Sequence, residues 1–297
     1  MLEELNFKKI FKNRVNLVNN YLENVFKNEI IPSRLKESML YSLNLGGKRI
    51  RPILCLSCAK LSNMDEELIL PFAASIEMIH TYSLIHDDLP AMDNDDIRRG
   101  KASNHKAFDE ATAILAGDGL LTEAFHFISN IKLPPKRILM AINVLAKASG
   151  ASGMVGGQII DILNTNKKTI SFENLKQMHA MKTGALLHAS CICGVILANG
   201  NKKLLNAIDI YGKALGLAFQ IIDDILDETS DTKTLGKPAG SDKKNGKITY
   251  PSLFGLEKSK SLAKEQVEIA KKSINNFKNK EVHFLQKLAQ YTLDRIA

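Results

Sequence analysis

Hydrophobic residues recur along most of the chain at the three- and four-residue spacing of an amphipathic helix, for example over residues 68–79 and 207–217. The two-residue alternation of a half-buried strand is hard to find, and Gly (18) and Pro (8) are scarce among 297 residues. The pattern predicts helices near residues 4–28, 34–44, 52–61, 66–88, 107–129, 136–149, 152–163, 172–199, 202–227, 250–278 and 282–295. We therefore predict an all-α fold of about ten or more helices.

One long stretch, residues 228–249, breaks the helical pattern. Gly, Pro and Lys crowd this stretch between Thr234 and Lys247, which favours a mobile loop. Because the loop directly follows a cluster of aspartates, it is a candidate lid whose lysines reach a phosphate, although its composition fits a plain surface loop equally well. No Pro- or Ser-rich linker divides the chain, so we expect a single domain over residues 1–297.

Composition narrows the function only a little. The formal charge of +8 fits an anionic substrate, nucleic acid or a membrane surface, and the scattered lysines do not choose among them. No unbroken apolar run reaches the roughly 18 residues of a membrane span, and the first residues do not resemble a secretory signal. The four cysteines lie in apolar stretches without histidine partners and are typical of reduced core thiols: Cys55, Cys58, Cys191 and Cys193. We expect a cytoplasmic protein with no stable membrane insertion and no nucleic-acid partner.

Two aspartate clusters, each at the end of an apolar stretch, carry most of the chemical information. The first contains Asp87, Asp88 and Asp93, and the second contains Asp223, Asp224 and Asp227. Carboxylates at the end of a buried helix are costly unless a cation compensates them. Mg²⁺ binds one or two carboxylates and leaves its other positions to water and phosphates. With Arg98 and Arg99 nearby, the clusters indicate diphosphate chemistry on Mg²⁺; two solvated acidic helix ends are the alternative.

The spacing within each cluster predicts its geometry. Asp223 and Asp227 are four residues apart and share one face of a helix. Asp87 and Asp93 are six apart, which is ~240° around a straight helix, so they would point in different directions. Pro90 disfavours helical geometry at the residue before it. We therefore predict that the helix ends near Asp88 and that the chain turns back to bring Asp93 toward Asp87.

A basic turn precedes another apolar helix. It reads Gly46-Gly47-Lys48-Arg49-Ile50-Arg51-Pro52, with Pro52 suited to the first turn of the helix. The glycines let the backbone bend, and the helix start supplies free N–H groups. With Lys48, Arg49 and Arg51, this turn is a candidate phosphate cradle, and an exposed basic turn is the alternative.

Polar residues inside apolar helices mark further candidates. His80 lies two turns before Asp87 on the same face, although a packed core histidine also fits. Lys182-Thr183-Gly184 interrupts an apolar helix, and a buried lysine needs an anion. The segment Gly157-Gln158-Ile159-Ile160-Asp161 echoes Phe219-Gln220-Ile221-Ile222-Asp223, with the amide and the carboxylate on one face in both.

Together these segments resemble the bacterial trans-isoprenyl diphosphate synthases. The motifs D-D-x4-D with R-R, D-D-x2-D, G-G-K-R-x-R-P, G-G-Q-x-x-D, K-T-G and F-Q-x-x-D-D occur between about residues 46 and 251. The resemblance implies helices around a deep central cavity, usually in a homodimer, and a reaction that joins an allylic diphosphate to isopentenyl diphosphate. It also implies three Mg²⁺ ions per site, with Mn²⁺ able to substitute.

The resemblance assigns a role to each matching residue. It implies that the six aspartates hold Mg²⁺ against the allylic diphosphate, with Asp87 and Asp223 in the catalytic set. It assigns the same diphosphate to Arg98, Lys182 and Lys237, and isopentenyl diphosphate to Lys48, Arg51, His80 and Arg99. It further implies that Thr183 and Gln220 stabilise the carbocation, and that Lys247 helps to close the lid.

Product length should depend on how deep the cavity runs below Asp87. Tyr82 lies five residues earlier, ~7.5 Å down the helix. A ring there would close the pocket after about three isoprene units, and in this family it resembles farnesyl diphosphate synthases. Ser83 is small, which leaves geranylgeranyl diphosphate open, and Tyr82 as ordinary core packing is also open.

Other classes of protein explain less of the sequence. The pair His86-Asp87 fits an HD-type metal phosphohydrolase, but that reading leaves the second aspartate cluster and the basic turn unexplained. A class I terpene cyclase would carry a different second metal motif. A non-catalytic partner subunit would be expected to lose one aspartate cluster, and both are intact.

Overall fold

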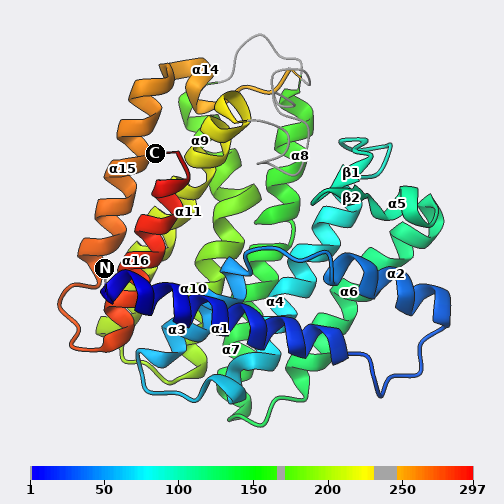
Figure 1. The fold of residues 1–297 in the computed structure, drawn as a ribbon, viewed down its shortest axis with the longest axis horizontal. Coiled ribbons are helices and arrows are strands. Elements are labelled where there is room, and N and C mark those ends of the chain that lie inside the picture. The colour runs from blue at the N-terminus through cyan, green and yellow to red at the C-terminus, as the bar shows by residue number, and fades with distance from the viewer. Residues whose placement is uncertain (1, 166–170, 231–245, 297) are drawn as a thin grey trace.

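The helical pattern of the sequence becomes helices along most of the chain in a computed structural model that describes residues 2–165, 171–230 and 246–296 (Figure 1). The longer helices are α1 (Leu2–Asn24), α2 (Ser33–Leu43), α3 (Ile50–Lys60), α4 (Glu66–Asp87), α6 (Glu110–Ser129), α7 (Pro135–Ser149), α8 (Met154–Asn164), α9 (Phe172–His179), α10 (Ala185–Leu197), α11 (Lys202–Thr229), α15 (Leu256–Ser273) and α16 (Lys280–Leu293). The all-α prediction is confirmed. Most of the predicted loop, including Lys237, lies outside the described residues.

One predicted helix begins later than expected and two others are interrupted. Near residue 107, the short α5 (Asn104–Ala107) ends, and the side chain of Asp109 then accepts a hydrogen bond from the backbone N–H of Thr112, which starts α6. Near residue 255, the short α14 (Tyr250–Phe254) ends at Gly255, whose φ of 77° favours glycine. Between α9 and α10, a π-helical turn, η1 (Ala180–Gly184), replaces α-helix.

Helix packing forms two apolar clusters. One gathers around α4 and α6, which lie along each other, and the other around α11 and α15, which also lie side by side (Figure 1). Between them, α10 packs against α3, α7 and α11, and Val144 and Ile196 contact both clusters. Because α4 and α11 each end in an aspartate cluster, this packing puts the two clusters on the walls of one cavity.

A small hairpin that the helical pattern did not predict holds the two arginines. Strands β1 (Ile97–Arg98) and β2 (Lys101–Ala102) pair antiparallel, with Ile97 opposite Ala102. Arg99 (φ 53°) and Gly100 (φ 77°) form the two-residue connection, and positive φ at both positions is what such tight hairpin turns need. Neighbouring positions of the hairpin therefore aim Arg98 and Arg99 at different partners.

The basic turn before α3 is held by one buried guanidinium. Arg49 donates to Glu77 Oε1 on α4 at 2.7 Å, to Asn19 Oδ1 on α1 at 2.8 Å and to the Leu43 carbonyl on α2 at 2.6 Å. The side chains of Arg49 and Glu77 are 1% and 2% exposed. Arg49 was predicted to help cradle phosphate, and that role stays a prediction; its bonds to protein groups fix the turn on three helices.

Within the described residues, three helical segments are long and apolar enough to cross a membrane by length and composition alone: Glu66–Asp87, Pro135–Asn164 and Phe172–Leu197. None of the three is an unbroken apolar run, because single charged or polar residues interrupt each one. In the first and third segments, 72% and 61% of the apolar window is buried inside the protein, which accounts for their composition. In the second only 39% is buried, so α7 and α8 leave apolar side chains on the surface.

We predict that Glu77→Gln lowers the free energy of unfolding by roughly 3 kcal/mol, because it leaves the Arg49 charge buried without its anion. Urea unfolding at 25 °C measures the loss. The matched control is Glu257→Gln: Glu257 is 86% exposed and pairs with Lys260 on the surface, so it should contribute less than about 0.5 kcal/mol. Equal losses in both variants would contradict the structural role of the Arg49–Glu77 pair.

Candidate active site

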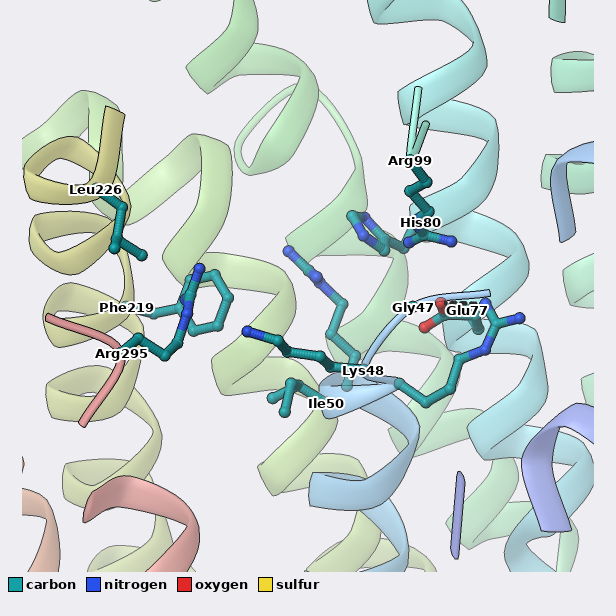
Figure 2. A pocket seen from close by; sticks show the side chains of 11 residues that line it. Gly47, Lys48, Ile50, Glu77, His80, Arg99, Phe219, Leu226 and Arg295 are labelled. Carbon is teal, nitrogen blue, oxygen red and sulfur yellow. Dashed lines mark hydrogen bonds and ion pairs between the residues drawn. The ribbon is translucent and has the colours of Figure 1, made fainter. Parts of the chain in front are cut away.

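A cationic cavity of about 400 Å³ lies at the start of α3 (Figure 2). The residues that line it are Gly47, Lys48, Arg49, Ile50, Arg51, Glu77, His80, Arg99, Phe219, Leu226 and Arg295. Figure 2 shows Lys48, His80, Arg99 and Arg295 arranged around it from four separate elements. The structure thus brings together all four residues predicted to bind isopentenyl diphosphate: Lys48, Arg51, His80 and Arg99.

The glycines of the basic turn let Arg99 lie against the backbone. Gly46 and Gly47 have φ values of 85° and 123°, which L side chains rarely adopt. A Cβ on Gly47 would stand 2.8 Å from Cζ of Arg99. The Arg99 guanidinium donates to the Gly46 carbonyl across this gap, so the turn and the hairpin are joined at the cavity wall.

The charges in this cavity are poorly compensated. Burial, with Arg99 nearby, lowers the pKa of Arg51 to about 10 although Glu77 and Asp223 oppose the shift. Burial and the surrounding arginines hold the pKa of His80 well below its usual value, so its imidazole is neutral at pH 7. Burial and Arg295 also lower the pKa of Lys48. A cluster of cations this costly is expected where an anionic ligand completes the site.

A larger cavity of about 710 Å³ adjoins the first, and Arg51, His80, Arg99, Phe219 and Arg295 line both. Acidic residues occupy one part of its wall: Asp87, Asp93, Asp95, Asp161, Asp223 and Asp224. Apolar residues occupy another part: Leu84, Met92, Met154, Val155, Ile159 and Ile162. The cavity therefore combines an acidic part of its wall with an apolar part.

The first aspartate cluster has the predicted geometry. Helix α4 ends at Asp87, and the Asp93 N–H donates to the Asp87 carbonyl at 2.9 Å, so the chain does turn back. Burial raises the pKa of the Asp87 carboxyl to about 6; Lys182 opposes the shift and Asp93 adds to it. Asp88 differs: it is 2% exposed, lines neither cavity, and accepts two hydrogen bonds from Arg98 Nε at 3.0 and 3.2 Å.

The three aspartates of the second cluster also differ in their surroundings. Asp223 lines the cavity and pairs with Arg295 at 2.9 Å. Asp224 is buried and binds protein groups, and Asp227 is buried (4% exposed) and lines neither cavity. The shared face predicted for Asp223 and Asp227 therefore does not bring both to the cavity. The role of all six aspartates as metal ligands stays a prediction, and Asp87, Asp93 and Asp223 are the best placed for it.

Among the described residues, no three His, Cys, Asp or Glu side chains are grouped so as to hold a metal ion by themselves. Mg²⁺ does not require such a group, because substrate phosphates and water fill most of its positions. Carboxylates on two walls of one cavity, with a raised pKa at Asp87, fit a divalent cation shared with a diphosphate.

The π-helical turn η1 carries Lys182 and Thr183 into the cavity. Lys182 Nζ binds Asp161 Oδ2 at 2.6 Å, and Thr183 Oγ1 donates to Gln220 Oε1 at 2.6 Å. Lys247 lies on the same side, 3.3 Å from Asp93 and 3.6 Å from Asp161. Burial tends to raise the pKa of Asp161, but Lys182 and Lys247 outweigh it and lower that pKa.

Two residues that line the larger cavity, Arg295 and Asp161, were not predicted as functional residues. Arg295 sits in the final turn, η2 (Asp294–Ile296), reaches Asp223 and lies over the Phe219 ring at 5.2 Å. Its only sequence signal was a lone basic residue near the end of the chain. Asp161 was noted for its echo of Asp223, and both line the same cavity.

An all-α fold with paired aspartate clusters and a basic pocket is typical of an enzyme that acts on phosphorylated substrates. The polyprenyl synthetase family model matches residues 32–289, and the chain belongs to that family. The resemblance inferred from the motifs is thus confirmed, as is the expectation of a prenyltransferase. The phosphohydrolase and terpene-cyclase alternatives lose their support.

Individual relatives agree over nearly the whole chain. It is 49% identical over 269 residues to a farnesyl diphosphate synthase of Micrococcus luteus, covering 90% of each chain. It is 47% identical over 266 residues to a geranylgeranyl diphosphate synthase of Cyanophora paradoxa, covering 89% of this chain and 88% of the relative. A solved geranyltransferase structure from Legionella pneumophila superposes with a TM-score of 0.89 at 35% identity, covering 100% of this chain and 99% of the other.

We predict that Asp87→Asn stabilises the metal-free protein at pH 8. With the pKa of Asp87 raised from 3.8 to about 6, the folded state binds a proton that the unfolded state has lost, so stability falls as the pH rises through this window. The ionised Asp87 carboxylate therefore lowers the free energy of unfolding by roughly 3 kcal/mol, at about 1.4 kcal/mol per pKa unit. This loss is fully present above pH 6 and disappears toward pH 4.

Urea unfolding in a chelating buffer at pH 8 and pH 4 measures the difference between the variant and the wild type. Asp96→Asn is the control, because Asp96 is 70% exposed and should matter little at either pH. If the D87N protein is no more stable than the wild type at pH 8, burial does not disfavour the ionised carboxylate.

Proposed function

We propose that the protein condenses an allylic diphosphate, dimethylallyl or geranyl, with isopentenyl diphosphate to give farnesyl diphosphate. The observation that carries the proposal is the pair of adjoining cavities. One is cationic and small, and the other is lined by carboxylates and by apolar side chains. Two diphosphates with hydrocarbon chains fit such a pair, because the reacting carbons would meet where the cavities share their lining residues.

In the smaller cavity, Lys48, Arg51 and Arg99 would bind the diphosphate of isopentenyl diphosphate, with neutral His80 as a hydrogen-bond partner. Arg295 lies at the border and would move from Asp223 to phosphate once Asp223 has another cation. In the larger cavity, Asp87, Asp93 and Asp223 would hold Mg²⁺, and Lys182 would grip the allylic diphosphate. When bound, Mg²⁺ supplies the charge that stabilises the departing diphosphate.

The reaction then depends on the apolar wall and on η1. The allylic carbon–oxygen bond breaks with its electron pair leaving on the diphosphate, and the isopentenyl double bond forms the new carbon–carbon bond. Oxygen atoms of Thr183 and Gln220 would face the positive charge in the meantime. Apolar walls exclude water, which would otherwise hydrolyse the cation. The released diphosphate is the base that we propose for the final proton.

Tyr82 supports farnesyl diphosphate as the product. It is 6% exposed, lines the larger cavity one and a half turns below Asp87, and packs edge-on against His86 at 5.7 Å. We propose this buried ring, packed against His86, as the floor of the cavity. Geranylgeranyl diphosphate is the second candidate, because the small Ser83 also lines the cavity and a geranylgeranyl diphosphate synthase is among the relatives.

We also propose a homodimer with contacts through α6 and α7. These neighbouring helices leave large apolar side chains on the surface: Ile114, Leu115, Leu139 and Met140, which are 44%, 58%, 68% and 47% exposed. Large apolar side chains exposed on neighbouring helices are a feature of protein–protein contact surfaces. A second copy of the chain is the partner that the family resemblance suggests.

We predict that the purified protein, given isopentenyl diphosphate, dimethylallyl diphosphate and Mg²⁺, makes mainly farnesyl diphosphate, and that Tyr82→Ala shifts the products to longer chains. Removing the ring deepens the cavity, whereas Tyr82→Phe keeps the ring and should keep the product. Chromatography of the dephosphorylated alcohols reads out chain length. Mainly C20 product from the wild type would favour the geranylgeranyl candidate, and no condensation would favour a non-catalytic subunit.

We predict that light scattering coupled to gel filtration gives about twice the chain mass of 32.9 kDa for the wild type. Leu139→Glu places a charge in the proposed contact and should give the mass of one chain. Leu5→Glu is the control, because Leu5 is 59% exposed on α1, away from the contact. A wild-type protein with the mass of one chain would remove the dimer from the proposal.

A further inference from the structure

A chain of three hydrogen bonds links α14, α11 and η1 at the edge of the larger cavity. The Tyr250 N–H donates to Asp224 Oδ2 at 2.9 Å, and Gln220 Nε2 donates to Asp224 Oδ1 at 2.7 Å. Thr183 Oγ1 then donates to Gln220 Oε1 at 2.6 Å. Asp224 is 2% exposed, so it meets these partners in a setting shielded from water.

The direction of each bond follows from the chemistry of the groups. A carboxylate whose two oxygens both accept cannot donate, so Gln220 must turn its NH₂ group to Asp224. The amide carbonyl of Gln220 then faces Thr183 and can only accept. The Thr183 hydroxyl has one proton and must give it to that carbonyl. Only the lone pairs of the hydroxyl oxygen therefore remain to face the cavity.

We infer that Asp224 is a positioning residue: through Gln220 it fixes the Thr183 hydroxyl so that only lone pairs face the allylic carbon. This inference rests on the proposed prenyl-transfer function, in which positive charge develops on that carbon. A dipole oriented before the reaction stabilises the charge without the cost of reorientation. The bonds that hold Asp224 to Tyr250 and Gln220 thus give it a role other than metal ligation.

The surroundings of Asp224 support an orienting role. His179 is 5% exposed, stacks near the Tyr250 ring at 5.6 Å, and has its Nε2 atom 3.6 Å from Asp224 Oδ2. Burial, with Lys182 nearby, lowers the pKa of His179 to about 4 although Asp161 opposes the shift, so the imidazole is neutral at pH 7. The Asp224 carboxylate is therefore held by the Tyr250 backbone N–H and the Gln220 amide, with the His179 ring close by, and it has little freedom to turn.

Asp224→Asn tests the inference, because an asparagine amide can donate to the Gln220 carbonyl and let Gln220 turn over. Its NH₂ group would then donate to Thr183, whose proton would point into the cavity. We expect the affinity for an allylic diphosphate analogue with an ammonium nitrogen in place of the cationic carbon to fall on the order of 30-fold. Affinity for the neutral carbon analogue should change less than about twofold. Calorimetry in excess Mg²⁺ measures both affinities.

Two further variants separate positioning from general damage. In a Thr183→Val background there is no hydroxyl to orient, so Asp224→Asn should no longer change the ratio of the two affinities. Asp209→Asn makes the same substitution on the outward side of α11, where Asp209 binds His188 and Lys213, and should leave the ratio as in the wild type.

If Asp224→Asn does not fold, Gln220→Leu cuts the same link while keeping the bond from Tyr250 to Asp224, and the ratio should fall similarly. An unchanged ratio in the folded variant overturns the inference. So does an equal loss for both analogues together with weaker Mn²⁺ binding by the protein, because that result makes Asp224 a metal ligand. A wild-type protein that condenses no substrates would instead refute the proposed function itself.

Discussion

The close approach of three backbones at η1 sets the geometry of the whole site. A Cβ on Gly157 of α8 would stand 2.2 Å from the Lys182 nitrogen, and one on Gly216 of α11 would stand 2.9 Å from the Gly184 Cα. Glycine on both sides therefore lets the π-turn lie directly between two helices. At that spacing, Asp161 of α8 reaches Lys182, and Gln220 of α11 reaches Thr183.

Some charged residues of the motifs form ion pairs within the protein, and their neighbours in sequence are available to a ligand. Asp88 binds Arg98, whereas Asp87 faces the cavity. Arg49 binds Glu77, whereas Lys48 lines the cationic pocket. Burying a charge is tolerable only with such partners. The ions held by protein groups keep the walls in place, and the uncompensated ones make the cavity ready for diphosphate and metal.

Much of the fold and of the first aspartate cluster could be predicted from local sequence patterns. The helices follow from hydrophobic period, and the return of Asp93 to Asp87 follows from Pro90. What could not be predicted depends on tertiary contacts. Neighbouring aspartates look alike in sequence, so nothing marks Asp88 or Asp224 as bound to protein groups. Arg295 is more than 70 residues from Asp223, and hydrophobic period does not distinguish a π-turn from the α-helices on either side of it.

The π-turn also makes the helix from Phe172 to Leu197 sensitive to its length. Such a turn closes its hydrogen bonds over five residues instead of four and so stores one extra residue. Losing that residue would let the turn close as ordinary α-helix, with α9 and α10 in nearly the same register. A deletion here would therefore spare the flanking helices and change only how the turn presents Lys182 and Thr183. In this segment the number of residues, as well as their identity, encodes the position of these two side chains.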